Sequence, residues 1–106
     1  MKQMTEKQIK KYAEIARQTY QKEVIENTVE WFAKQMKDEL NEHLDRPGWK
    51  KEPMNYLWNR LVEECLELDT ELKNRPSKKI IIKECADVAN FAMMIADVYE
   101  KGKFDE

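Results

Sequence analysis

Residues 61–97 read LVEECLELDTELKNRPSKKIIIKECADVANFAMMIAD, and this stretch decides how the chain folds. Apolar residues recur at helical spacing on both sides of the tetrapeptide Asn74-Arg75-Pro76-Ser77. Because proline disfavours helix at the residue before it, the tetrapeptide predicts a turn between two helices. Two helices joined by so short a turn can pack antiparallel. The stretch therefore predicts a helical hairpin.

Each helix of this predicted hairpin carries a cluster of carboxylates. The first cluster has the pattern Glu63-Glu64-x-x-Glu67, and the second has the pattern Glu84-x-x-Asp87. Residues three and four apart on a helix share a face, so each cluster can aim at least two carboxylates in one direction. If the helices pack antiparallel, four carboxylates can converge on one point.

The carboxylates of the first helix fall on or beside its apolar stripe. With about 100° between successive residues, Glu64 belongs to the arc of the apolar stripe, with Leu61 one turn before it and Leu68 one turn after it. Glu67 lies at the edge of the same arc, whereas Glu63 is turned further towards water. The pattern predicts that Glu64 faces inward.

On the second helix, Glu84 and Asp87 lie in the middle of an apolar face. That face consists of Ile80, Val88, Phe91, Met94, Ile95 and Val98. A buried carboxylate is costly unless it is paired, protonated or bound to metal. Arg60 is the one basic residue expected near these acids, so the pattern favours a bound metal ion.

The composition indicates a single all-helical domain. The chain has 106 residues, which suffice for one core, and it contains only two glycines and three prolines. Its 19 basic and 21 acidic residues nearly balance, which argues against nucleic acid or an anionic membrane as a partner. We find no transmembrane stretch or signal peptide in the sequence and expect a soluble, cytoplasmic protein.

Helical periodicity and capping signals predict a four-helix-bundle-like fold. Thr5 begins a capping box with Gln8, Ser77 is an N-cap, and Gly102 is a stop signal. The expected helices cover about residues 5–20, 24–44, 53–73 and 78–101. Around residues 21–28 the pattern is ambiguous, because a second helix could begin there or the first could continue.

The last predicted helix is apolar around most of its circumference. A helix of this kind is buried on several sides, and a small four-helix protein can rarely bury one helix so fully. We therefore expect a homo-oligomer, either a dimer or a tetramer.

The candidate ligands are all oxygen atoms, which identifies the kind of metal. The only histidine, His43, lies outside both clusters and is expected to pack or to face solvent, and the Glu-x-x-His pairs of a di-iron bundle are missing. Oxygen-only ligation suits Mg²⁺, with Mn²⁺ as a substitute. Such an ion can bind phosphates and activate a water molecule. Cations for the rim of a phosphate site are available at Lys50, Lys51, Arg60, Lys78, Lys79 and Lys83.

The two carboxylate motifs, with sixteen residues between them, resemble those of the all-α nucleoside triphosphate pyrophosphohydrolases, the MazG-like superfamily. That superfamily includes dimeric dUTPases, dCTP pyrophosphatases and phosphoribosyl-ATP pyrophosphohydrolase. The continuation from Asp87 to Ala92 and the Gly48-Trp49 turn look like the small MazG-like proteins of phages and archaea. The resemblance covers about residues 32–97 and does not extend to the first helix.

The resemblance implies hydrolysis of a nucleoside triphosphate between its α and β phosphates, which releases a nucleoside monophosphate and pyrophosphate. It implies that Mg²⁺ is bound by Glu64, Glu67, Glu84 and Asp87. It gives Glu63 a supporting role in water activation, beside Glu64. It places Lys83 and Asn90 near the nucleotide, with Lys83 on a phosphate, and Trp49 against the base.

Other interpretations stay open. Lys83 is as well explained as a surface lysine, and Trp49 is better explained by packing over helix ends than by base stacking. The chain as a whole could be a non-catalytic helical oligomer, an adaptor or regulatory protein whose acids are paired with bases. Within the enzyme class, a phosphoribosyl-ATP pyrophosphohydrolase would carry the same motif.

Overall fold

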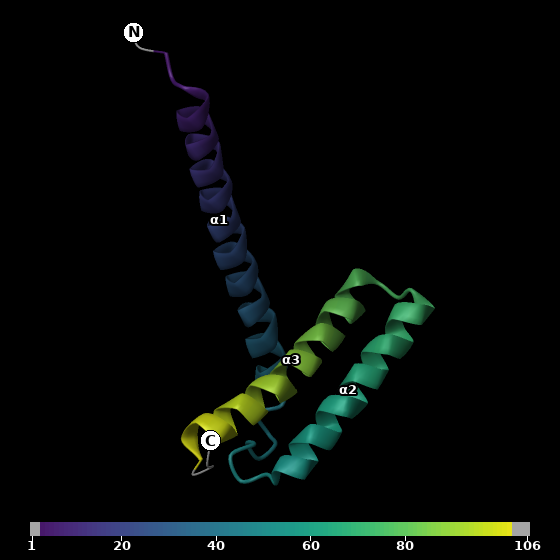
Figure 1. The fold of residues 1–106 in the computed structure, drawn as a ribbon. Coiled ribbons are helices and arrows are strands. Elements are labelled where there is room, and N and C mark those ends of the chain that lie inside the picture. Colours follow the sequence, from purple (N-terminus) through teal and green to yellow (C-terminus); the bar gives the residue numbers. More distant parts are fainter. Residues whose placement is uncertain (1–2, 103–106) are drawn as a thin grey trace. The chain divides into compact units, whose positions relative to one another are not determined.

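The computed structural model describes residues 3–102, which form three α-helices and no β-strand (Figure 1). Helix α1 spans Glu6–Asn41, α2 spans Met54–Asn74 and α3 spans Lys78–Lys101. The prediction of an all-helical chain is confirmed. The chain divides into two compact units, residues 1–33 and 34–106, and the boundary falls within α1.

The prediction of two separate helices before residue 45 is wrong, because α1 is continuous from Glu6 to Asn41. At about 100° per residue, its first apolar stripe faces one side and its second faces the opposite side. The first stripe contains Ile9, Ala13, Ala16, Tyr20, Val24 and Trp31, and the second contains Ile25, Val29, Phe32, Met36 and Leu40. The two stripes suggested two helices, but neither proline nor glycine lies between them, so nothing interrupts the backbone.

Local signals set the ends of the helices much as expected. The Thr5 hydroxyl accepts a hydrogen bond from the Gln8 backbone N–H at 3.1 Å, and the Gln8 side chain accepts one from the Thr5 N–H at 2.9 Å. This reciprocal pair is the predicted capping box. Ser77 caps α3 by accepting from the Ile80 N–H at 3.4 Å, and the Gly102 N–H donates to the Val98 carbonyl at 2.8 Å.

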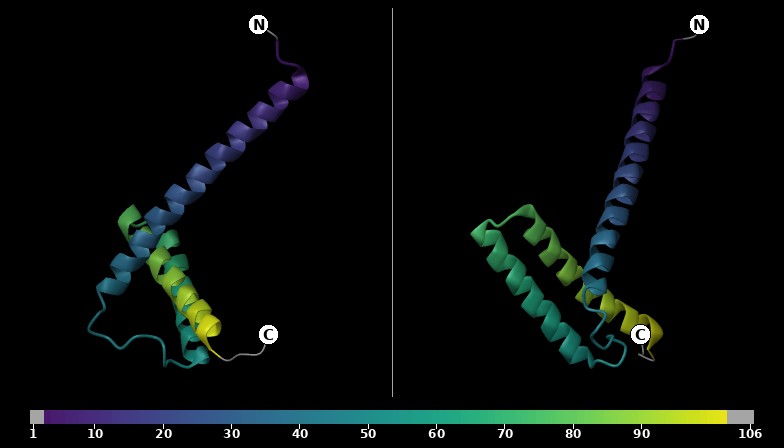
Figure 2. Two further views of the ribbon diagram at one scale, coloured as in Figure 1. Left: turned by 90° about the vertical axis from the view of Figure 1, so that its left-hand side faces the viewer. Right: turned by 180° about the vertical axis from the view of Figure 1, so that it is seen from behind.

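Helices α2 and α3 pack against each other as the predicted hairpin (Figures 1 and 2). The turn between them begins at Arg75, whose φ of 50° is left-handed, and continues through Pro76. The left-handed residue ends α2, and the proline that follows cannot continue it. Leu57 and Ala86 are the fully buried apolar residues of the described chain, one from each helix.

The loop between α1 and α2 is attached to the end of α3 by Asp97. The Trp49 indole N–H donates to Asp97 Oδ2 at 3.0 Å, and Lys50 pairs with the same oxygen. Lys101 pairs with the other carboxylate oxygen at 2.7 Å. Lys101, then Lys50 and Trp49, hold the pKa of Asp97 far below its ordinary value. Asp97 therefore fixes the loop in place.

Residues 34–41, the last turns of α1, belong to the same compact unit as the hairpin. The Asn90 side chain of α3 donates through Nδ2 to the Met36 carbonyl oxygen at 3.1 Å. This contact brings the end of α1 beside the middle of α3. In the described part of the chain, no helix is both long and apolar enough to span a membrane.

Candidate metal centre and adjoining cavity

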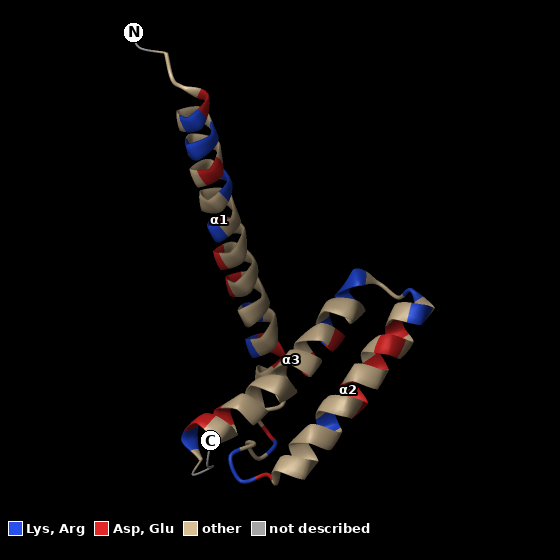
Figure 3. Cartoon of the chain, viewed as in Figure 1, with Lys and Arg blue, Asp and Glu red and all other residues tan. Residues whose placement is uncertain are grey.

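Three of the predicted ligands, Glu64, Glu84 and Asp87, converge between α2 and α3. Each offers a carboxylate oxygen, and these oxygens all lie within 4.8 Å of one another. Glu64 comes from the middle of α2, and Glu84 and Asp87 come from successive turns of α3. The hairpin thus brings together acids that lie twenty residues apart in the sequence, as the motif spacing predicted. Figure 3 shows acidic residues on both helices.

The burial of these acids leaves carboxylate oxygens without a hydrogen-bond donor. Only 5% of Glu64 is exposed, and its Oε1 accepts from Arg60 at 2.7 Å. Glu64 Oε2 and Glu84 Oε2 are both buried, and neither has a partner. Unpaired buried anionic oxygens that face one another are unfavourable unless a proton or a cation joins them. The donor set therefore fits a hard divalent cation.

Burial and like charge raise the pKa of Glu64 to about 7. Removal from water is the largest cause, followed by a hydrogen bond with Glu67 and by the charges of Glu67 and Asp87. The Arg60 guanidinium opposes the shift but does not cancel it. Near neutral pH the protonated form of Glu64 is therefore favoured far more than in an ordinary glutamate.

The pKa values of the two α3 acids are raised as well. Burial raises the pKa of Asp87 to about 6, and Glu39 adds to the shift by its charge and by a hydrogen bond. The pKa of Glu84 is raised by burial, then by the charges of Asp87 and Glu67. Lys83 lowers both values without reversing either shift. All three converging acids resist ionisation when no cation is present.

Glu39 is a site residue that the sequence reasoning missed. It lies near the end of α1, close enough to raise the pKa of Asp87, and it has a buried Oε2 without a partner. A signal was present, because Glu39 lies beside the second apolar stripe of α1, next to Met36 and Leu40. This pattern indicates that Glu39 can face inward, but it does not indicate that Glu39 approaches Asp87.

Glu39 also belongs to a second group of potential ligands, with Glu42 and His43. Glu42 and His43 are exposed and follow the end of α1. His43 is close enough to Asp87 to lower its pKa slightly. His43 is exposed, and it lies nearer to the acids than expected.

A cavity of about 460 Å³ adjoins the converging acids. Its charged and polar lining includes Glu39, Arg46, Arg60, Glu64, Asp87 and Asn90. Its apolar and aromatic lining includes Leu40, Tyr56, Leu57, Phe91 and Met94. The loop after α1 contributes the rim, which includes His43, Pro47, Gly48, Trp49 and Glu52. A ligand in this cavity would contact both the acids and apolar side chains.

The other predicted acids lie beside the centre. Glu67 is exposed, shares a hydrogen bond with Glu64, and lines a shallow hollow with Glu84. Glu63 is also exposed and forms an ion pair with Arg60. The structure thus brings Glu64, Glu84 and Asp87 together, with Glu67 at their edge and Glu63 outside the group.

The predicted substrate-binding residues occupy different positions. Arg60 lies over the Phe91 ring, 5.1 Å from its centroid, and lines the cavity while it is paired with both Glu63 and Glu64. Asn90 also lines the cavity, and only 3% of it is exposed. Lys83 is exposed near the acids, and Trp49 lies at the rim with its indole N–H bonded to Asp97.

The arrangement can hold a divalent cation between two helices and present it to a ligand in the adjoining cavity. Such a cation would neutralise the acids, polarise a bound phosphate and acidify a bound water molecule. Comparison with protein families, with curated proteins and with solved structures finds no match to this chain.

Proposed function

We propose that the protein is a Mg²⁺-dependent nucleotide pyrophosphohydrolase. It would hydrolyse ribo- or deoxyribonucleoside triphosphates between the α and β phosphates, giving a nucleoside monophosphate and pyrophosphate. The observation that carries the proposal is the convergence of Glu64, Glu84 and Asp87 within 4.8 Å beside a cavity of about 460 Å³. The reaction itself is inferred from the resemblance of the motif spacing to that of the MazG-like superfamily.

Glu64, Glu84 and Asp87 would hold the ion through their buried oxygens. When bound, Mg²⁺ supplies charge neutralisation at the phosphates and lowers the pKa of an attacking water molecule. Glu67, which is exposed beside these acids, would complete the ligand set or accept a proton from that water. Glu63 would act as a positioning residue, because it shares Arg60 with Glu64.

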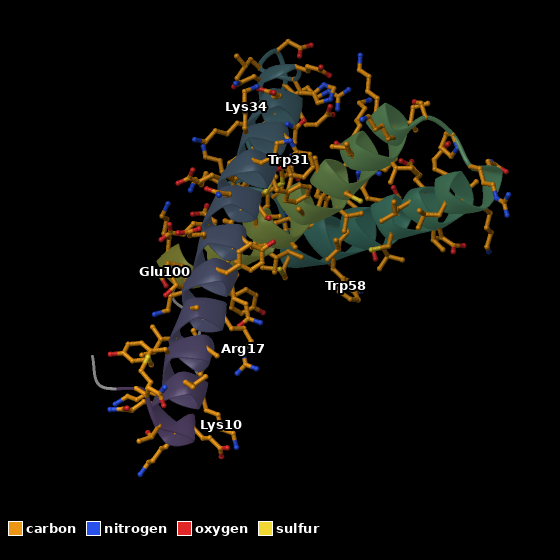
Figure 4. The ribbon with its side chains drawn as sticks, turned by 90° about the horizontal axis from the view of Figure 1, so that it is seen from above. Lys10, Arg17, Trp31, Lys34, Trp58 and Glu100 are labelled. Atoms are coloured by element: carbon orange, nitrogen blue, oxygen red, sulfur yellow. The ribbon has the colours of Figure 1, made fainter. Side chains whose placement is uncertain are left out.

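The direct test is pyrophosphate release from a panel of ribo- and deoxyribonucleoside triphosphates, with Mg²⁺ and with EDTA. We expect release that requires the metal and falls at least about a hundredfold in Glu64→Gln and Asp87→Asn, since loss of one catalytic group costs on that order. Glu100→Gln is the control, because Glu100 is an exposed acid near the end of α3 (Figure 4). Its rate should match that of the wild type.

Absence of pyrophosphate release from every nucleotide, by a folded protein that binds Mg²⁺, would reject the reaction but leave the metal centre. Release that is unchanged in folded Glu64→Gln would reject the site itself. The two results therefore separate the chemistry from its location.

A non-catalytic helical oligomer is the second candidate, and Arg60 favours it. Arg60 pairs with both Glu63 and Glu64, which is the compensation that a purely structural acid cluster requires. Within residues 3–102, however, no ion pair involves Glu84 or Asp87. Lys83 lowers the pKa of both acids but forms no ion pair with either, so two of the three converging acids lack the ion pairs that this alternative needs.

We also propose that the protein acts as a homo-oligomer. No residue of α1 is buried, and its first apolar stripe is wholly exposed. On α2, Trp58 and Leu66 are 57% and 62% exposed, and Trp58 projects outward from the helix (Figure 4). Exposed apolar surface of this extent is typical of an interface.

The charge pattern of α1 favours a second copy of this chain as the partner that covers the exposed apolar stripe. Residues 6–22 contain five basic and two acidic residues, whereas residues 23–33 contain three acidic residues and no basic ones (Figure 3). Antiparallel pairing of two α1 helices would set each basic half beside an acidic half. Light scattering after gel filtration should show a dimer or tetramer that Tyr20→Glu dissociates. A monomeric wild type would reject the proposal.

A further inference from the structure

The loop between α1 and α2 brings to the cavity an arginine that no carboxylate compensates. Arg46 lines the same cavity as Glu39, Glu64 and Asp87. The other arginine of the lining, Arg60, is already paired with two glutamates. Within residues 3–102, by contrast, Arg46 forms no ion pair. Its guanidinium is therefore free to bind an anionic group of a ligand in the cavity.

The local backbone gives Arg46 a defined position. Its N–H donates to the His43 carbonyl oxygen at 3.0 Å, which closes a turn shortly after the end of α1. Pro47 follows, and a proline disfavours a helical conformation at the residue before it. The chain therefore cannot simply continue α1 at Arg46, and this side chain starts from the loop that lines the cavity.

The remainder of this loop depends on Asp97 for its attachment. Residues 42–51 are exposed apart from Trp49, and a Cβ atom added at Gly48 would meet nothing within 4 Å. A segment with so few contacts is easily displaced. Trp49 and Lys50 both bind Oδ2 of Asp97, which holds the loop against α3. Asp97 itself lies outside the cavity lining, so its effect on a ligand would pass through the loop.

From these contacts we infer that Arg46 binds the phosphates of the ligand and that Asp97 is a positioning residue, which holds in place the loop that carries Arg46. A guanidinium presents paired N–H donors that match two oxygens of one phosphate. The inference adds to the site a residue from outside both carboxylate motifs. The choice of phosphate as the anion rests on the proposed function.

The probe is inorganic pyrophosphate with Mg²⁺, because it is a product of the proposed reaction and has no base for Trp49 to contact. Calorimetric titration of the full chain would give its Kd. We expect Arg46→Ala to raise this Kd on the order of tenfold or more, since a hydrogen bond between charged groups is lost. Lys51→Ala is the control, because Lys51 is an exposed cation of the same loop outside the cavity lining. Its Kd should stay within about twofold of the wild type.

A double variant separates positioning from general stability. Asp97→Ala alone should raise the Kd by roughly threefold to tenfold, because the loop is released. If Asp97 acts through Arg46, adding Asp97→Ala to Arg46→Ala should change the Kd little further. A merely structural role of Asp97 would weaken binding equally in both backgrounds. Asp69→Ala is the matched control, since Asp69 pairs with a lysine four residues on, as Asp97 does, but on exposed α2 surface.

Three results would each overturn the inference. They are unchanged pyrophosphate affinity in folded Arg46→Ala, fully additive effects of the two substitutions, and failure of pyrophosphate to bind the wild type. If Asp97→Ala does not fold, Trp49→Phe with Lys50→Ala breaks the same attachment from the loop side. The same lack of additivity with Arg46→Ala is then expected.

The proposed reaction is judged by a different measurement, the release of pyrophosphate from nucleotides. If no nucleotide is hydrolysed but pyrophosphate binding depends on Arg46, the proposed reaction fails and the inference stands. If nucleotides are hydrolysed and pyrophosphate binding ignores Arg46, the inference fails and the reaction stands.

Discussion

Glu64→Gln should make the metal-free protein less sensitive to rising pH. The pKa of Glu64 is about 7 in the folded chain against 4.5 for an unperturbed glutamate. Between these values the folded state keeps a proton that the unfolded state has lost. Stability from this residue is therefore present at low pH and is lost as pH rises through that interval. Glutamine does not titrate, so the substitution removes the effect.

The size of the effect follows from proton linkage. A residue whose pKa rises from 4.5 to about 7 on folding lowers the free energy of unfolding by roughly 2 to 3 kcal/mol between pH 5 and pH 8. Asp87 and Glu84 have shifts of the same sign and remain in the variant, so some pH dependence should persist. The prediction therefore concerns the change in the free energy of unfolding between pH 5 and pH 8, which should be larger in the wild type than in Glu64→Gln by this amount.

The assay is urea unfolding in EDTA at pH 5 and pH 8, at one protein concentration, because association would otherwise contribute. Glu63→Gln is the matched control. Like Glu64→Gln it removes one acidic partner of Arg60, but Glu63 is exposed. We expect the control to follow the wild type. If Glu64→Gln keeps the full wild-type dependence on pH, the argument that burial penalises this carboxylate is wrong.

Three further predictions concern the same unit. Mg²⁺ at a hundred times its Kd should raise the free energy of unfolding at pH 8 by ~2.7 kcal/mol, and Asp87→Asn should abolish this gain in metal titrations followed by urea unfolding. Ser77→Ala should cost ~1 kcal/mol in urea unfolding, because it removes the cap of α3. Trp49→Phe should cost ~1 kcal/mol in the same assay by removing the hydrogen bond to Asp97, whereas Trp58→Phe, at an exposed position, should stay within about 0.5 kcal/mol of wild type.

For each of these three predictions, one result would contradict the reasoning. An equal Mg²⁺ effect in Asp87→Asn would place the ion elsewhere. A neutral Ser77→Ala would mean that the hairpin turn, and not the cap, sets the start of α3. Equal losses in Trp49→Phe and Trp58→Phe would mean that the bond to Asp97 does not stabilise the loop.

The hairpin and most of its acids could be predicted because their signals are local. Turn chemistry at Pro76 and helical periodicity on each side determine α2 and α3. The same periodicity places Glu64, Glu84 and Asp87 on facing sides. Glu39 required knowledge of a contact between distant parts of the chain, because α1 approaches Asp87 from outside the hairpin. Its own pattern gave only a weak indication.

The continuity of α1 was harder to predict for a different reason. Periodicity reports which side of a helix is apolar, and a stripe that changes sides resembles two helices with a break between them. Helix continuity depends on the backbone, where residues 21–24 contain no breaker. Helix α1 likewise ends at Asn41, three residues before the predicted end at residue 44, since Glu42 to Asp45 form turns. Sequence patterns therefore located the apolar surfaces of α1 better than its boundaries.

The convergence of Glu64, Glu84 and Asp87 has a consequence for how the sequence responds to selection. Each of these three carboxylates resists ionisation when no metal is bound. A neutral substitution at any of the three positions would remove that cost. Selection for stability alone, under metal-poor conditions, should therefore enrich neutral residues there. A library screened for abundance and the same library screened for turnover should then rank these positions in opposite order. Conflict between the two rankings would mark the functional centre without any knowledge of the substrate.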